Sequence, residues 1–179
     1  MTRPRDLYAL ALEHRLPLVS GLCALGSIVV VSSAWSFQLI GGYMPCELCL
    51  EQRIPYYAGA PLALLALLVS WKAPDKTPLV RLLLIAFALL MVYGGGVGAY
   101  QAGAEWGFWP GPLDCSGDGG GGVNDAASLL NSLQTIKIVS CTDVQLRILG
   151  LSFAGWNVLT SAGLAAIAFW AALARGRRA

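Results

Sequence analysis

Pro45-Cys46-Glu47-Leu48-Cys49-Leu50-Glu51-Gln52-Arg53 lies where one long apolar run of the sequence ends and the next begins. If a helix starts near Pro45, Cys46 and Cys49 lie one turn apart on one face, and Arg53 lies one turn further along it. A helix N-terminus and a nearby guanidinium both favour a thiolate over a thiol. The stretch therefore predicts a reactive pair of cysteines, with a fixed positive charge beside the inner sulfur of Cys49.

The composition of the whole chain indicates a membrane protein. Of its 179 residues, 56% are hydrophobic and 12% are charged, with a mean hydropathy of +0.64. A soluble domain has about 25% charged residues, roughly twice this share. The net charge is only +2, which gives no support for a nucleic-acid partner.

Four apolar runs are each long enough to cross about 30 Å of hydrocarbon. Because lipid cannot satisfy backbone polar groups, we expect each run to be a helix. The sequence thus predicts an all-α protein with one integral membrane domain over residues 1–179, built as a four-transmembrane-helix bundle. The predicted spans are 16–40, 48–71, 79–100 and 148–174, and the predicted outer loops are 41–47 and 101–147.

Prolines and glycines inside two of these runs predict local features of the bundle. Pro55 and Pro61 each remove a helical hydrogen bond, so we expect the second helix to bend at both positions. Glycines in the third run allow close approach of a neighbouring helix. These glycines are Gly94, Gly95, Gly96 and Gly98.

The distribution of basic residues predicts the orientation of the bundle. Nine of the twelve lysines and arginines lie on the side that holds both termini and the connection between the second and third runs. They are Arg3, Arg5, Arg15, Lys72, Lys76, Arg81, Arg175, Arg177 and Arg178. The positive-inside rule therefore predicts that both termini are cytoplasmic. The first run is longer than the core of a signal peptide, about 7–15 residues, so we expect it to be retained.

The long outer loop has two features of its own. Residues 104–113 are rich in tryptophan and phenylalanine, which favour the membrane–water interface. Residues 125–139 predict a short amphipathic helix, capped by Asn124. This helix either lies flat on the outer leaflet or packs on the ends of the membrane helices, and the sequence does not separate the two.

Four cysteines lie on the predicted outer side, where disulfides persist in bacteria. Spacing favours the pairs Cys46–Cys49 and Cys115–Cys141, although four cysteines allow three pairings. Either pair has a purely structural alternative, but a four-residue loop gains little closure entropy, so Cys46–Cys49 is more typical of a redox-active pair. A zinc site is disfavoured because the second pair lacks the usual close spacing. Cys23 lies inside the first run and is expected to be a small packing residue.

Arg53 is predicted to lie well inside the second span. An arginine there is either an anchor that reaches the interface or a functional charge. In the functional interpretation, it stabilises negative charge on the Cys49 thiolate and on the oxygen of an electron acceptor. Gln52 precedes Arg53 and lies about 100° around the helix from it, so we expect Gln52 to pack against a neighbour or to form hydrogen bonds. The sequence contains no flavin or haem motif, and a membrane supplies quinone as a diffusible acceptor of two electrons.

Together these motifs resemble the DsbB family of bacterial inner-membrane thiol oxidases. The resemblance covers the first cysteine pair, the following Gln52 and Arg53, and one cysteine near each end of the long loop. It also covers residues 105–112 and 151–157, together with the order of the spans. One departure is Gln101, at the end of the third run, where family members often have histidine; this weakens any proposal of a proton donor there.

The resemblance implies a mechanism and its partners. Cys115 would be attacked by a reduced periplasmic thioredoxin-fold oxidase of the DsbA type, and Cys141 would be its pair. Electrons would pass to Cys46–Cys49, with Cys49 and Arg53 beside ubiquinone or menaquinone. The main alternative is a membrane scaffold or assembly factor with purely structural disulfides. A relative of vitamin K reductase fits less well, because the order of its cysteines differs.

Overall fold

The computed structural model describes residues 15–111, 144 and 146–174. Its elements are α2 (Arg15–Leu39), α3 (Glu47–Glu51), α4 (Ile54–Lys72), the 3-10 helix η1 (Pro74–Lys76), α5 (Thr77–Glu105), β1 (Arg147–Ile148), β2 (Leu151–Ser152) and α7 (Phe153–Leu173). The helix expected at 125–139 and the two cysteines of the long loop, Cys115 and Cys141, lie outside the described residues.

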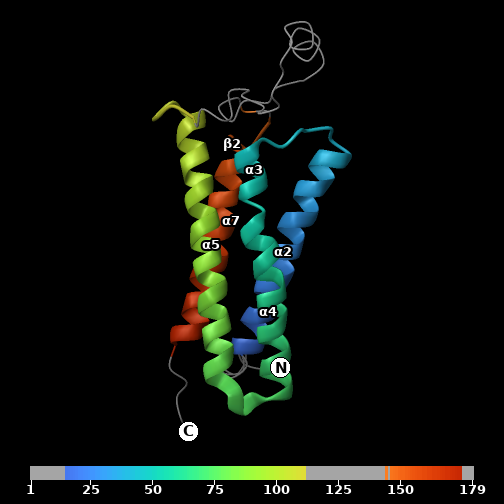
Figure 1. Ribbon diagram of the computed structural model, residues 1–179, viewed down its shortest axis with the longest axis vertical. Coiled ribbons are helices and arrows are strands. Elements are labelled where there is room, and N and C mark those ends of the chain that lie inside the picture. Colours follow the sequence, from blue (N-terminus) through green and yellow to red (C-terminus); the bar gives the residue numbers. More distant parts are fainter. Residues whose placement is uncertain (1–14, 112–143, 145, 175–179) are drawn as a thin grey trace, which may run out of the picture.

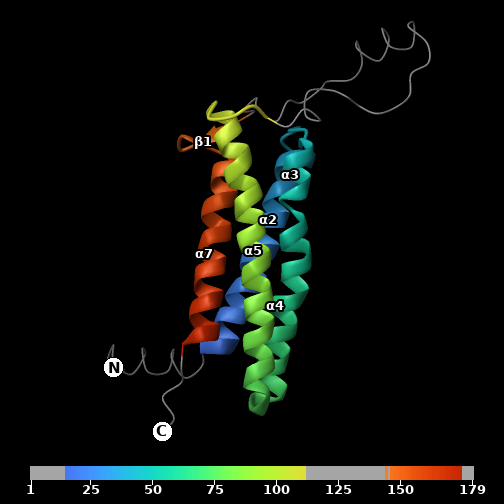
Figure 2. The ribbon, with the colours of Figure 1, turned by 60° about the vertical axis from the view of Figure 1, so that its left-hand side comes forward.

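The described part of the chain is a bundle of long helices with their axes roughly aligned (Figure 1). Within the described residues, four segments are long and apolar enough to span a membrane: Arg15–Leu39, Glu47–Lys72, Thr77–Glu105 and Phe153–Leu173. The predicted four-helix membrane bundle is therefore confirmed. Seen after a turn of 60°, α5 runs beside both α4 and α7 (Figure 2).

Both described ends of the chain lie at the same end of the bundle. The guanidinium groups of Arg15 in α2 and Arg81 in α5 donate hydrogen bonds to the carbonyl oxygen of Ala174, just after α7. Cations near a helix C-terminus satisfy its free carbonyl groups and complement its dipole. α3, the last turn of α5 and the start of α7 lie at the opposite end (Figure 1). Cys46 is the N-cap of α3 and Cys49 lies within it.

Small residues let the helices pack closely around a few large apolar side chains, while many other large apolar side chains face outward. The core contains Phe87, Leu84 and Met91 of α5, packed among alanines of the neighbouring helices. Cys23 is fully buried in this core, so its predicted packing role is confirmed. Leucines such as Leu22 and Leu68 are about half exposed, as expected for side chains that contact lipid.

The glycines of α5 make the close approach predicted for them, with one exception. A Cβ on Gly94 would lie 3.1 Å from Pro55, and one on Gly95 would lie 3.3 Å from Ser161. A Cβ on Gly98 would lie 2.9 Å from the amide nitrogen of Asn157. Gly96 has no such neighbour within 4 Å among the described residues. Three of the four glycines therefore allow α4 and α7 to approach α5.

The second span is broken rather than bent at its outer end. It consists of α3 and α4, which are separated by a turn at Gln52 and Arg53. Pro55 has no N–H, so the carbonyl of Glu51 loses its helical donor and the helix ends one turn before the proline. α4 runs through Pro61 without interruption. The expected continuous helix over 48–71 is therefore wrong at this point, because Arg53 lies in the turn as the N-cap of α4, which begins at Ile54.

The third span continues past its predicted end at residue 100. α5 extends to Glu105 and ends in a Schellman motif: the N–H of Phe108 donates to Gly103 and that of Gly107 donates to Ala104. Gly107 has a φ of 77°, which the motif requires. The indole N–H of Trp109 donates to the carbonyl of Tyr100, so the aromatic segment folds back on the helix. Gln101 therefore lies inside α5, not at its end.

The fourth span begins later than predicted, at Phe153 rather than residue 148. Arg147 and Ile148 pair with Leu151 and Ser152 in a two-stranded antiparallel hairpin. Its turn has a positive φ at Leu149 and at Gly150, as a type I′ turn requires. Ser152 then caps α7 by accepting a hydrogen bond from the N–H of Gly155. Because residues 148–152 are mainly apolar, the sequence predicted a helix there and did not reveal the turn and the N-cap.

Candidate functional site

The cysteine pair lies at the end of the bundle opposite the described termini. Cys46 is the N-cap of α3 and is only 6% exposed, whereas Cys49 within α3 is half-buried. Both are free thiols, and the Cys46 sulfur donates to the Cys49 sulfur across 2.9 Å. This hydrogen bond, followed by burial, raises the pKa of the Cys46 thiol above its usual value. In the reduced pair, Cys46 therefore keeps its proton and Cys49 receives the hydrogen bond.

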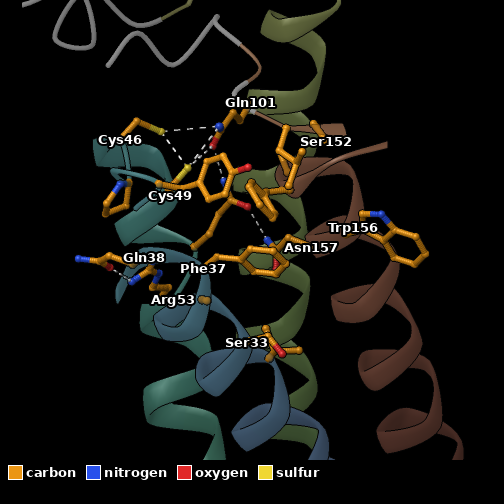
Figure 3. Close-up of a pocket in the computed structure, with 18 of the residues that line it drawn as sticks. Ser33, Phe37, Gln38, Cys46, Cys49, Arg53, Gln101, Ser152, Trp156 and Asn157 are labelled. Atoms are coloured by element: carbon orange, nitrogen blue, oxygen red, sulfur yellow. Dashed lines mark hydrogen bonds between the residues drawn. The ribbon is translucent and has the colours of Figure 1, made fainter. Parts of the chain in front are cut away.

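Gln101 of α5 lies directly beside the two sulfurs (Figure 3). It is only 4% exposed, and its amide nitrogen lies 3.5 Å from the Cys49 sulfur and 3.7 Å from the Cys46 sulfur. The same nitrogen donates to Glu105 across 3.2 Å. An N–H directed at a sulfur favours negative charge on it. Gln101 thus contacts the candidate redox centre, which the sequence did not predict.

Further buried polar side chains connect Gln101 to α7. Gln101 accepts a hydrogen bond from Gln52, and Gln52 accepts one from Asn157. Asn157 in turn accepts one from the hydroxyl of Tyr56. The predicted hydrogen-bonding role of Gln52 is confirmed. Polar residues within apolar spans are functional candidates, and this signal was available in the sequence for Tyr56 and Asn157.

Arg53 is held at the junction of α3 and α4. Its guanidinium donates to the side-chain oxygen of Gln38 across 2.8 Å (Figure 3). It also lies 6.0 Å from the ring centroid of Trp35. The second distance is within the usual range of a cation–π contact. Both partners belong to α2, so Arg53 joins the broken span to α2. Its half-buried side chain also lines the cavity beside Cys49.

A cavity of about 390 Å³ adjoins these residues. Its walls are mainly apolar and come from α2, the α2–α3 connection, α3, α4, α5, the hairpin and α7. Phe37, Tyr43 and Phe153 form one wall, with ring centroids 4.9–6.3 Å apart. Cys46, Cys49, Arg53 and Gln101 lie on its lining. Apolar walls with a few convergent polar groups are typical of sites for small organic cofactors.

The described residues thus form a bundle of helices long and apolar enough to span a membrane, with two adjacent thiols on the lining of an apolar cavity. The family model described as Disulfide bond formation protein DsbB matches residues 17–171. The chain belongs to the DsbB family, and this membership makes it a membrane protein of disulfide bond formation.

One curated relative resembles the chain along most of its length. This relative is Uncharacterized protein RP370 of Rickettsia prowazekii (strain Madrid E), which is 28% identical over 140 residues. The alignment covers 74% of both chains. No solved structure gives a significant match.

The structure brings three of the predicted site residues together: Cys46, Cys49 and Arg53 all line the same cavity. Their catalytic and cofactor-binding roles stay predictions. Cys115 and Cys141 lie outside the described residues, so their pairing and their exchange with the first pair also stay predictions.

Proposed function

We propose that this protein is a quinone-dependent thiol oxidase, which reoxidises a periplasmic DsbA-type dithiol protein. The observation that carries the proposal is a pair of thiols 2.9 Å apart on the lining of an apolar cavity within a membrane bundle. Two thiols that become a disulfide release two electrons and two protons, so an acceptor of both must reach the sulfurs. A cavity at membrane depth is suited to an acceptor dissolved in the lipid.

The residues around the cavity fit a quinone. Its volume of about 390 Å³ lies within the range of roughly 300–1,000 Å³ that is usual for ligand pockets. The aromatic wall of Phe37 and Phe153 suits a flat ring, and the guanidinium of Arg53 is a fixed positive group beside it. When bound, ubiquinone or menaquinone supplies a two-electron, two-proton acceptor.

The chain's own residues have distinct roles in this proposal. Cys49 is the sulfur whose negative charge is stabilised, by the Cys46 thiol and by the Gln101 amide. Cys46 closes the disulfide and loses the second proton. Arg53 orients the acceptor and favours negative charge on its oxygen.

The second cysteine pair provides the proposed entry point for electrons. A reduced partner with a thioredoxin fold attacks Cys115 and forms a mixed disulfide. This attack breaks the Cys115–Cys141 disulfide and releases the Cys141 thiol. The second thiol of the partner then displaces Cys115, so the partner leaves as a disulfide and Cys115 and Cys141 are both reduced. Exchange with the Cys46–Cys49 disulfide reoxidises Cys115 and Cys141 and leaves Cys46 and Cys49 as the thiols that the acceptor oxidises. DsbA is itself a strong oxidant, at about −120 mV, so its reoxidation requires an acceptor such as quinone to draw the transfer forward.

The proposed location is the bacterial inner membrane, with several spans and both termini in the cytoplasm. The clustering of Arg15 and Arg81 at the end of the bundle that holds the described termini supports this orientation. The cysteine pair then faces the periplasm, where a DsbA-type partner would be found.

Thiol titration of the purified protein tests the proposal. Reduced protein is mixed with ubiquinone or menaquinone, and free thiols and quinone absorbance are followed together. We expect one quinone to be reduced for each pair of thiols lost, and a Cys49→Ser variant to reduce none. Disulfides that do not respond to thiols or to either quinone would instead identify a scaffold with structural bridges.

A mixed-disulfide trap tests the role of the second pair. With Cys141→Ala, a DsbA-type partner should stay attached through Cys115, and the product is visible on a non-reducing gel. A partner that is trapped only at Cys46 or Cys49 would reverse the proposed order of the two pairs.

A further inference from the structure

The amide side chains between α7 and the sulfurs form a chain with a defined direction. Asn157, Gln52 and Gln101 come from three separate segments of the bundle, and each contacts the next. Buried polar groups at membrane depth are costly unless they are paired. The electron transfer proposed above does not require Asn157 or Gln52, so their place beside the site needs a separate explanation.

The direction of the chain is set at Asn157. Its amide nitrogen donates to the backbone carbonyl of Gly94 across 3.1 Å. A backbone carbonyl can only accept a hydrogen bond, so the nitrogen of Asn157 must face it. The Asn157 oxygen accepts from the hydroxyl of Tyr56 across 2.7 Å. Because Gly98 has no Cβ, the Asn157 amide fits against α5 and keeps this orientation.

Each following amide inherits this orientation. The Asn157 nitrogen donates to the Gln52 oxygen across 2.7 Å, so the Gln52 nitrogen points away from Asn157. That nitrogen donates to the Gln101 oxygen across 2.6 Å. The Gln101 nitrogen is then the amide atom nearer to Cys49, at 3.5 Å from its sulfur, against 3.8 Å for the Gln101 oxygen.

We propose that Asn157 and Gln52 are positioning residues, which direct the N–H of Gln101 rather than its carbonyl oxygen toward the Cys49 sulfur. The inference rests on the proposed oxidation of the Cys46–Cys49 thiols. It names the residues that orient the Gln101 amide toward the Cys49 sulfur before that reaction. A reversed amide would present an oxygen to the sulfur and oppose the negative charge of a thiolate. The Gly94 carbonyl thus fixes the orientation of the Asn157 amide, and through it the orientations of the Gln52 and Gln101 amides beside the sulfur.

Glu105 offers a second explanation for the orientation of Gln101. It also accepts from the Gln101 nitrogen, and one of its oxygens is buried without a hydrogen bond in the described part of the chain. Glu105 contacts the nitrogen of the Gln101 amide, whereas Gln52 contacts its oxygen. Variants at Asn157 and Gln52 therefore separate the two explanations. If Glu105 alone orients Gln101, those variants leave the reactivity of the Cys49 sulfur unchanged.

The test measures the reactivity of Cys49 in the full-length reduced protein, purified in detergent. Iodoacetamide labelling of each cysteine is followed over time and over pH by peptide mass spectrometry. Asn157→Asp can only accept a hydrogen bond, so Gln52 turns its nitrogen toward α7 and its oxygen toward Gln101. Since hydrogen bonds to charged groups are among the stronger ones, we expect Cys49 labelling to slow by about tenfold and its pH midpoint to rise.

Two further variants and one internal reference keep the test decisive. Gln52→Met interrupts the chain without touching the Gly94 carbonyl, and it should slow Cys49 labelling by at least about threefold. Gln101→Leu shows the full effect of losing the amide. Cys23 is fully buried in the core, so its slow labelling verifies in the same sample that each variant is folded.

The outcomes separate this inference from the proposed function. Slower Cys49 labelling in folded Gln52→Met and Asn157→Asp, with a raised pH midpoint, supports the directed chain. A folded Gln52→Met variant that labels Cys49 as fast as the wild-type protein overturns the inference of a directed chain, whether or not Asn157→Asp folds. The labelling assay contains no quinone, so failure of quinone reduction by the wild-type protein counts against the proposed function alone.

Discussion

Replacing Arg53 separates its role as a functional charge from its role as a structural anchor. Arg53→Met keeps most of the apolar stem and removes the guanidinium, whereas Arg53→Lys keeps the positive charge. The structure gives the guanidinium two contacts on α2, a hydrogen bond to Gln38 of 2.8 Å and the face of Trp35 at 6.0 Å. The Lys variant tests the charge, and the Met variant tests the loss of both contacts.

The two roles predict effects of different size. Loss of one charge-assisted hydrogen bond and one exposed cation–π contact costs about 1–3 kcal/mol of folding stability. Loss of a fixed group that stabilises developing negative charge costs about 10²–10³ in rate. We therefore expect Arg53→Met to reduce quinone far more slowly, while its thermal unfolding midpoint falls by only a few degrees.

The assay follows quinone absorbance after addition to reduced protein, over a range of quinone concentrations. Unfolding is measured in the same detergent. A large fall in kcat, partly restored by Arg53→Lys, supports the functional charge. Normal turnover of Arg53→Met at every quinone concentration would refute the reasoning and leave Arg53 as an anchor between α2 and α4.

Two further predictions concern packing and pH. Gly98→Ala places a methyl 2.9 Å from the Asn157 nitrogen, so we expect the folding stability to fall by about 1–3 kcal/mol. Gly96→Ala is the control, because its methyl meets no atom of the described residues within 4 Å. Thermal unfolding compares the two variants, and equal losses of stability would contradict the close packing at Gly98. Because the pKa of the Cys46 thiol is raised, its alkylation in the reduced protein should begin at a more alkaline pH than that of an ordinary thiol. Mass spectrometry resolves it from Cys49, and simultaneous labelling of both at neutral pH would contradict this order.

The boundaries of the spans show where apolar composition misleads. The sequence predicted the fourth helix from residue 148 because residues 148–152 are apolar, yet a hairpin turn at Gly150 delays the helix to Phe153. It also ended the third helix before Gln101, although α5 continues one turn further to Glu105. Hydropathy measures whether a segment partitions into lipid, while turns and caps determine where its helix begins and ends.

The sequence by itself determined the class of fold and the presence of a close cysteine pair. Four apolar runs of sufficient length leave helices as the available way to satisfy the backbone in lipid, and a separation of three residues keeps Cys46 and Cys49 together in any helix. The tertiary structure alone decided what surrounds the sulfurs. Gln101 and Asn157 reach the site from helices that are distant in sequence, because contacts between helices depend on their packing and rotation, which hydropathy does not encode.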